Sequence, residues 1–263
     1  MVESNPKVWI AALRGSHDRL GGLIGKLGAE QFRAQSYDKD WTVAQVLSHL
    51  GSGAEIGQLM LAAALGRGGT PGRDDMTPIW DRWNTKAPDE QVADSLAVNE
   101  DLVRAYEALS GAELAAMRYT FLGMELDAAG LVRMRLSEHA VHTWDVEVTF
   151  DPVAPVAAEA VALLIDNVAA FVAPRLGKAR PDSFAARITT TAPDRDYLLT
   201  SADKVTMADW RAADAVAPDA ELSMPAEALI RLAMGRLDPD HTPSEVHADP
   251  AALERLRVTF PGF

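Results

Sequence analysis

The sequence contains no cysteine, and this absence removes three kinds of chemistry. A chain without thiols has no disulfides, no thiolate ligands for zinc and no cysteine nucleophile. Any thiol chemistry that this protein performs must therefore use a thiol supplied by a separate molecule.

Positive charge is also scarce. The chain has 25 Lys and Arg residues against 38 Asp and Glu residues, which gives a net charge of −13. Such a chain offers no positive stripe for phosphate groups. We therefore expect neither a nucleic-acid partner nor an anionic-membrane partner.

Long uninterrupted apolar runs are missing as well. The most apolar segment, residues 156–172, contains Glu159 and Asp166, which makes it a poor membrane span. The first residues lack the basic-then-apolar pattern of a signal peptide. We expect a cytoplasmic protein.

Apolar residues recur at helical spacing through most of the first part of the chain. The predicted long helices cover residues 5–27, 43–65, 89–109 and 128–150. Thr42 followed three residues later by Gln45 is typical of a capping box at a helix start. The glycine-rich and proline-rich residues 66–86 are expected to form a loop, whose Trp80 and Trp83 either line a pocket or pack on the helices.

A fifth helix is expected from Pro155 to Val172, and the pattern changes after residue 175. Short β-branched runs predict strands at residues 187–191, 197–200 and 205–207, followed by helices that begin near Pro225 and Pro250. Strands and helices segregated in this way are typical of a small α+β domain. The sequence thus predicts a helical bundle over residues 1–175 and an α+β domain over residues 176–263.

A candidate site lies in residues 136–145. On a helix, Glu138 and His142 project from the same face one turn apart, and Asp145 continues that stripe. A carboxylate and an imidazole beside a buried apolar face are costly to desolvate unless something pairs with them. A divalent metal ion would pair with both groups.

His49 is the best third ligand, because it lies beside apolar residues of an earlier helix. Two histidines and one carboxylate form the ligand set of a catalytic zinc site, which leaves a position open for water or substrate. Facing helices of a bundle can bring such ligands to one depth. The alternatives are a core histidine bonded to a carbonyl at position 49, and a surface hydrogen bond between Glu138 and His142.

Three further polar residues could have a functional role or an ordinary structural one. Asp145 either orients His142 by accepting its second N–H or has a simple surface role. His139 competes as a ligand but points away from the stripe of Glu138. His17 lies among polar residues and is expected at the surface.

Three segments together resemble a known family. They are residues 41–50 (WTVAQVLSHL), 135–145 (RLSEHAVHTWD) and 232–236 (LAMGR). They are similar to the mycothiol-dependent maleylpyruvate isomerase family. The resemblance implies a DinB-like up-down four-helix bundle that binds metal, followed by a small α+β domain similar to sterol carrier proteins.

The resemblance also implies site roles. His49, Glu138 and His142 would bind zinc or a similar divalent ion, with mycothiol as the thiol cosubstrate. Arg236 would hold an anionic group of the substrate, and Arg82 is a second candidate for that task.

Three functions remain in competition. The first is an enzyme in which a metal-bound thiol attacks a small electrophile, as an isomerase or as a thiol S-transferase. The second is metal-assisted hydrolysis, with Asp145 or His139 as the general base. The third is a non-catalytic module that binds a metal, an apolar ligand or a protein.

Overall fold

The computed structural model describes residues 3–121, 123–179, 182–211 and 217–262. Contacts divide the chain into an N-terminal unit, Glu3–Ala154, and a C-terminal unit that begins at Pro155. The boundary expected at residue 175 lies later than this division. The reason is that helix α8 (Ala158–Asn167) packs against helix α10 (Ala226–Ala233) of the C-terminal unit.

The N-terminal unit is mostly helical and carries one short β-hairpin. Its elements are α1 (Pro6–Ile24), α2 (Ala29–Phe32), α3 (Val43–Ala64), α4 (Arg73–Asn84), α5 (Pro88–Glu107), α6 (Gly111–Ala116), β1 (Tyr119–Phe121), β2 (Met124–Leu126) and α7 (Ala128–Val148). The long helices predicted from apolar spacing are confirmed as α1, α3, α5 and α7, with ends that differ by at most a turn.

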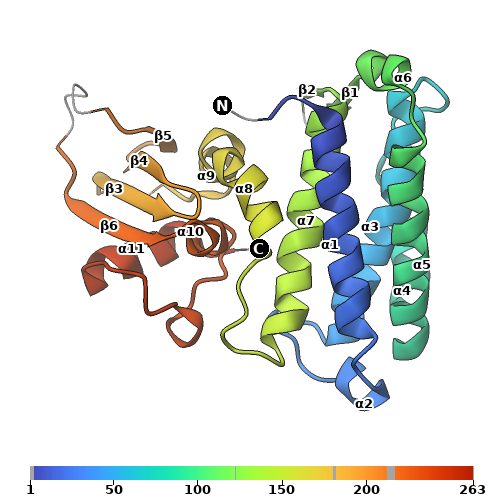
Figure 1. Ribbon diagram of the computed structural model, residues 1–263, viewed down its shortest axis with the longest axis horizontal. Helices are drawn as coiled ribbons and strands as arrows, with labels where there is room; N and C mark the ends of the chain where they lie inside the picture. Colours follow the sequence, from blue (N-terminus) through green and yellow to red (C-terminus); the bar gives the residue numbers. More distant parts are fainter. Residues whose placement is uncertain (1–2, 122, 180–181, 212–216, 263) are drawn as a thin grey trace. The chain divides into compact units, whose positions relative to one another are not determined.

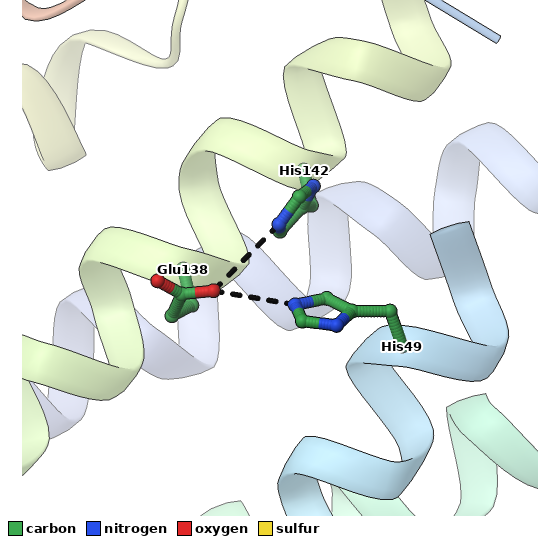
Figure 2. A group of neighbouring side chains, drawn as sticks. All are labelled: His49, Glu138 and His142. Carbon is green, nitrogen blue, oxygen red and sulfur yellow. Dashed lines mark hydrogen bonds and ion pairs between the residues drawn. The ribbon is translucent and has the colours of Figure 1, made fainter. Parts of the chain in front are cut away.

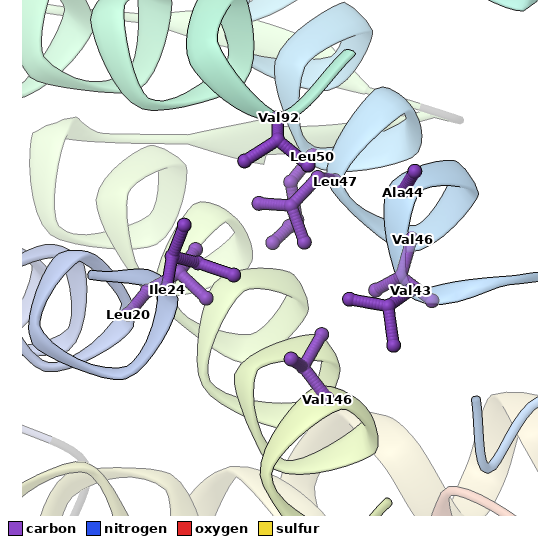
Figure 3. Close-up of a cluster of buried hydrophobic side chains, with 9 residues drawn as sticks. All are labelled: Leu20, Ile24, Val43, Ala44, Val46, Leu47, Leu50, Val92 and Val146. Atoms are coloured by element: carbon purple, nitrogen blue, oxygen red, sulfur yellow. The ribbon is translucent and has the colours of Figure 1, made fainter. Parts of the chain in front are cut away.

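These long helices pack around a common core (Figure 1). Helix α1 contacts α5 and α7, and helix α3 contacts the same two helices. Figure 3 shows apolar side chains from all of them meeting in the interior. The buried cluster consists of Leu20, Ile24, Val43, Ala44, Val46, Leu47, Leu50, Val92 and Val146. This packing holds α3 beside α7, and these two helices carry the candidate ligands.

Local sequence sets where both of these helices begin. The predicted capping box is confirmed: the backbone N–H of Thr42 donates to Gln45 Oε1 at 2.8 Å, and that of Gln45 donates to Thr42 Oγ1 at 3.3 Å. At the start of α7, Asp127 Oδ1 accepts from the backbone N–H of Gly130 at 2.8 Å. These contacts satisfy donors that the first helical turn leaves unpaired.

The prediction of a loop over residues 66–86 is wrong for most of its length. Residues Arg73–Asn84 form α4, which has Pro78 in its interior. This helix could not be predicted from the sequence, because only two of its residues, Ile79 and Trp83, are buried. Two residues are too few to give a clear apolar period.

Trp83 attaches α4 to α3. Its ring lies where a Cβ atom on Gly51 would come within 2.2 Å, so glycine is what lets the indole approach α3. The indole Nε1 donates to Glu55 Oε2 at 2.9 Å. Of the two alternatives for this tryptophan, packing on the helices is confirmed. Trp80, by contrast, is exposed.

The C-terminal unit contains a sheet and several helices. Its elements are α8, a π-helical segment η1 (Val168–Val172), α9 (Ala173–Leu176), β3 (Phe184–Thr191), β4 (Arg195–Ser201), β5 (Val205–Asp209), β6 (Ala220–Pro225), α10, η2 (Pro239–His241) and α11 (Pro250–Thr259). The sheet order is β5-β4-β3-β6, with β3 antiparallel to β4 and parallel to β6. Helix α10 packs on β3 and β6.

The three predicted strands lie within β3, β4 and β5, whereas sequence reasoning missed β6. Its residues, AELSMP, include no β-branched or aromatic side chain, so local preference does not indicate a strand. Parallel pairing with β3 forms it instead. The apolar residues 156–172 fall largely in α8 and η1, and the described part of the chain has no helix long and apolar enough to cross a membrane.

The contact between Gly51 and Trp83 leads to a stability prediction. Gly51→Ala should lower the free energy of unfolding by about 1–3 kcal/mol, because the added methyl group overpacks against the indole. Gly22→Ala is the matched control: nothing lies within 4 Å of its added Cβ. This control should be stabilising by about 0.4–1 kcal/mol, because alanine restricts the unfolded chain. Urea denaturation measures both, and equal effects of the two substitutions would contradict the account.

Candidate metal centre

The structure brings His49, Glu138 and His142 together. His49 projects from α3, and the other two project from one face of α7 (Figure 2). His49 Nε2 lies 3.3 Å from Glu138 Oε2, and His142 Nε2 lies 3.6 Å from the same oxygen. One ligand atom from each residue lies within 4.8 Å of the others.

These separations fit a shared metal ion. Nitrogen and oxygen ligands bind zinc at about 2.0–2.1 Å in a tetrahedral arrangement, so neighbouring ligand atoms stand roughly 3.4 Å apart. The two measured contacts to Glu138 lie close to this value, and a small side-chain rotation would complete the set. Donor chemistry agrees, since imidazole nitrogen and carboxylate oxygen are both zinc ligands.

Asp145 is bound to His142 on the side away from Glu138. Its side chain is fully buried, and its Oδ2 lies 2.8 Å from His142 Nδ1. A surface role for Asp145 is therefore wrong. If a cation takes the place of the contact between Nε2 and Glu138, this carboxylate would favour the tautomer that has its proton at Nδ1 and binds the cation through Nε2.

Burial and charge act in opposite directions on the ligand groups. Burial alone would raise the pKa of Glu138, but hydrogen bonds from His142 and His49 outweigh it and hold that pKa well below its usual value. Burial lowers the pKa of His49, and its hydrogen bond to Glu138 only partly opposes this. The site therefore presents an ionised carboxylate and a histidine that favours its neutral form, which are the protonation states that metal binding requires.

A small molecule can reach this site. The side chains of His49 and Glu138 are 36% and 41% exposed, whereas that of His142 is 10% exposed. The Trp41 ring stands beside both histidines, with centroids 5.0 Å from that of His49 and 6.1 Å from that of His142. Sequence reasoning missed this aromatic wall, although Trp41 precedes the helix cap of α3 directly.

His139 and His17 are buried between the helices of the N-terminal unit. His139 is fully buried, and its Nδ1 lies 2.8 Å from Ser16 Oγ, so it points away from Glu138 as expected. The prediction that His17 is a surface residue is wrong: it is only 8% exposed, and its Nε2 lies 3.2 Å from Glu100 Oε2. His17 lies on the buried face of α1, which its polar neighbours in the sequence did not indicate.

The two arginines singled out from the sequence have partners of their own. Arg82, on α4, forms an ion pair with Glu55 of α3. Arg236 belongs to the C-terminal unit, where its buried side chain donates from Nη1 to the carbonyl of Met234 at 2.9 Å.

Comparisons with known proteins agree with the resemblance seen in the sequence. A family model described as the mycothiol maleylpyruvate isomerase N-terminal domain matches residues 13–147. Among solved structures, the chain is similar to the mycothiol-dependent maleylpyruvate isomerase, with a TM-score of 0.69, and to a histidine-to-alanine mutant of that enzyme, with a TM-score of 0.68. Each match has 14% identity and covers 94% of this chain and 93% of the other. No curated protein sequence matches this chain.

At such low identity the structural likeness shows a common fold of mixed helices and sheet. The family match is more specific, because residues 13–147 include all three metal-ligand candidates and most of each of the four long helices. The chain therefore belongs to the mycothiol maleylpyruvate isomerase family.

Proposed function

We propose that this protein is a metal-dependent enzyme that uses mycothiol as a nucleophile against a small anionic electrophile, as an isomerase or as a thiol S-transferase. The observation that carries the proposal is the convergence of His49, Glu138 and His142 from two helices, with two of these side chains open to solvent. Family membership supports the thiol, and the absence of cysteine means that the thiol comes from outside.

A bound divalent ion, zinc by preference for this ligand set, would lower the pKa of a coordinated thiol so that a thiolate exists at neutral pH. His49, Glu138 and His142 would hold that ion, and Asp145 would keep His142 in the tautomer that binds it. Trp41 would exclude water from the side of the site where it lies beside His49 and His142.

After binding, the reaction would need only the thiol and the electrophile. In the isomerase version, the thiolate adds to one carbon of an activated cis double bond. The adduct rotates about what is now a single bond, and elimination of the same thiolate restores the double bond in the trans form. In the transferase version the carbon–sulfur bond persists. Either the adjacent carbon of the former double bond takes up the proton that the thiol lost, or the attacked carbon releases a leaving group.

We also propose that an arginine binds the carboxylate of the substrate. A planar guanidinium suits a carboxylate because it donates two parallel hydrogen bonds. Arg236 is the first candidate, on the strength of the family resemblance. Arg82 is the second, and its ion pair with Glu55 would have to open.

For the two units we propose the architecture that the resemblance implies. The N-terminal unit would be a DinB-like up-down four-helix bundle, which is supported by the mutual packing of α1, α3, α5 and α7. The C-terminal unit would be a sterol-carrier-like α+β domain, which is supported by its sheet with α10 packed on β3 and β6.

Metal-assisted hydrolysis is less well supported, because it needs a general base beside the metal. Asp145 is fully buried and bonded to His142, and His139 is fully buried and bonded to Ser16. Neither of the bases that the sequence offered is therefore open to a substrate. A purely structural metal site is also disfavoured, since structural sites are closed by protein ligands whereas His49 and Glu138 are partly exposed.

Metal removal tests the proposed function. The purified protein should contain about one zinc ion or similar divalent ion per chain, and it should isomerise or conjugate an electrophile such as maleylpyruvate when mycothiol is present. Dialysis against a chelator should abolish the rate, and added zinc should restore it. A rate that is insensitive to the chelator, or one that needs no thiol, would refute the proposal.

Loss of one ligand should have the same effect. His49→Ala should lose stoichiometric zinc and reduce turnover at least a hundredfold, while the helical circular dichroism is retained. His247→Ala is the matched control, since His247 is exposed and belongs to the C-terminal unit. If His49→Ala keeps its zinc, the ligand assignment is wrong.

The contact from Asp145 to His142 predicts a smaller effect on affinity. Asp145→Asn should weaken zinc binding by about 10–100-fold, because partners that orient a metal-binding histidine contribute that much. Glu147→Gln on the same helix is the control, as Glu147 pairs with Arg19 instead. Competition with a chromophoric chelator measures both affinities, and equal values would show that Asp145 does not orient the ligand.

A further inference from the structure

Arg135 is a buried cation one helical turn before Glu138 on α7. Its side chain is only 9% exposed, and no carboxylate of the described residues forms an ion pair with it. Burial lowers the pKa of Arg135 to about 10, although the charge of Glu138 and the phenol of Tyr106 oppose this. The guanidinium therefore remains charged at neutral pH.

This guanidinium links three helices close to the candidate metal centre. Arg135 Nη2 donates to the carbonyl of Leu50 on α3 at 2.8 Å and to Asn99 Oδ1 on α5 at 2.5 Å. Leu50 is the residue after His49. The amide of Asn99 in turn donates to the carbonyl of Ser95 at 2.8 Å, which fixes the orientation of its oxygen toward the arginine.

The Arg135 guanidinium contacts α3 at Gly53. A Cβ atom on Gly53 would lie 2.9 Å from Arg135 Nη1, which is closer than real Cβ contacts come. The group that approaches Gly53 is this arginine side chain, and at Gly57 it is Leu102.

Stability alone does not account for this arrangement. A buried charge without an ion pair costs free energy that an apolar side chain of similar volume would not. The contacts of Arg135 do, however, reach the backbone of α3 at the residue next to a ligand. One residue of slippage between two helices is about 1.5 Å, whereas a working metal site tolerates only about 0.5 Å.

We propose that Arg135 is a positioning residue that sets the register of α3 against α7, so that His49 meets Glu138 and His142 at one point. The inference rests on the proposed function in so far as the shared point is a metal site. Arg135 does not touch the ligand atoms themselves. It acts through the carbonyl of Leu50 and through Asn99, and Gly53 supplies the space it needs.

To test this proposal, zinc and cobalt affinities are measured in variants of the full-length chain that remove or replace Arg135. Arg135→Met should weaken zinc binding about 10–100-fold, as loss of an orienting partner does. Arg135→Lys, which keeps a donor and the charge, should restore part of the affinity. Arg133→Met is the matched control on the same helix and should bind zinc as the wild type does.

Two further readouts separate positioning from ordinary stabilisation. In the cobalt-substituted protein, Arg135→Met should shift the visible d–d bands, because the ligands meet in altered geometry, whereas a merely structural loss would lower only the melting temperature. Gly53→Ala keeps the arginine but displaces it, so it should weaken zinc binding in the same direction even if Arg135→Met does not fold.

The outcomes are distinct. Wild-type affinity and unshifted bands in both Arg135→Met and Gly53→Ala would overturn this inference and leave the proposed function intact. A wild-type protein that binds zinc but has no thiol-dependent activity would overturn the proposed function, while weakened zinc binding in the variants would still support the inference. A wild-type protein that binds no zinc would overturn both.

Discussion

The side-by-side packing of α3 and α7 is the constraint on which the rest of this structure depends. Neither helix holds a complete ligand set: α7 carries a carboxylate and one imidazole, and α3 carries the other imidazole. Buried apolar residues such as Leu47 and Val146 hold the two helices together, and capped N-termini set where each begins. The candidate ligands therefore come together only when the tertiary fold is formed, because no short segment contains all three.

Around the candidate ligands, each neighbouring group has a different contact. The buried Asp145 carboxylate contacts His142 Nδ1, and the Trp41 ring lies beside both imidazoles. The exposed sides of His49 and Glu138 leave the centre open to a partner from solution. In a chain of this family that has no cysteine, an open candidate metal site would suit a thiol brought from outside.

Sequence reasoning was most successful where local rules decide the structure. The long helices, the Thr42 cap and the pairing of Glu138 with His142 on one face all follow from periodicity or spacing within a single segment. It failed where tertiary contacts decide. Helix α4 depends on Trp83 packing over Gly51, and the buried position of His17 depends on Glu100 of another helix. Strand β6 likewise exists through its pairing with β3 rather than through its own residues.

We propose above all that the sulfur of an external thiol binds a cation held by His49, Glu138 and His142. Cobalt substitution followed by titration with mycothiol tests this most directly, because a sulfur–cobalt bond produces a charge-transfer absorption band in the near ultraviolet. The account predicts that this band grows to saturation at one thiol per cobalt, and that it is absent in His49→Ala. A cobalt spectrum that does not change at saturating thiol would contradict the account.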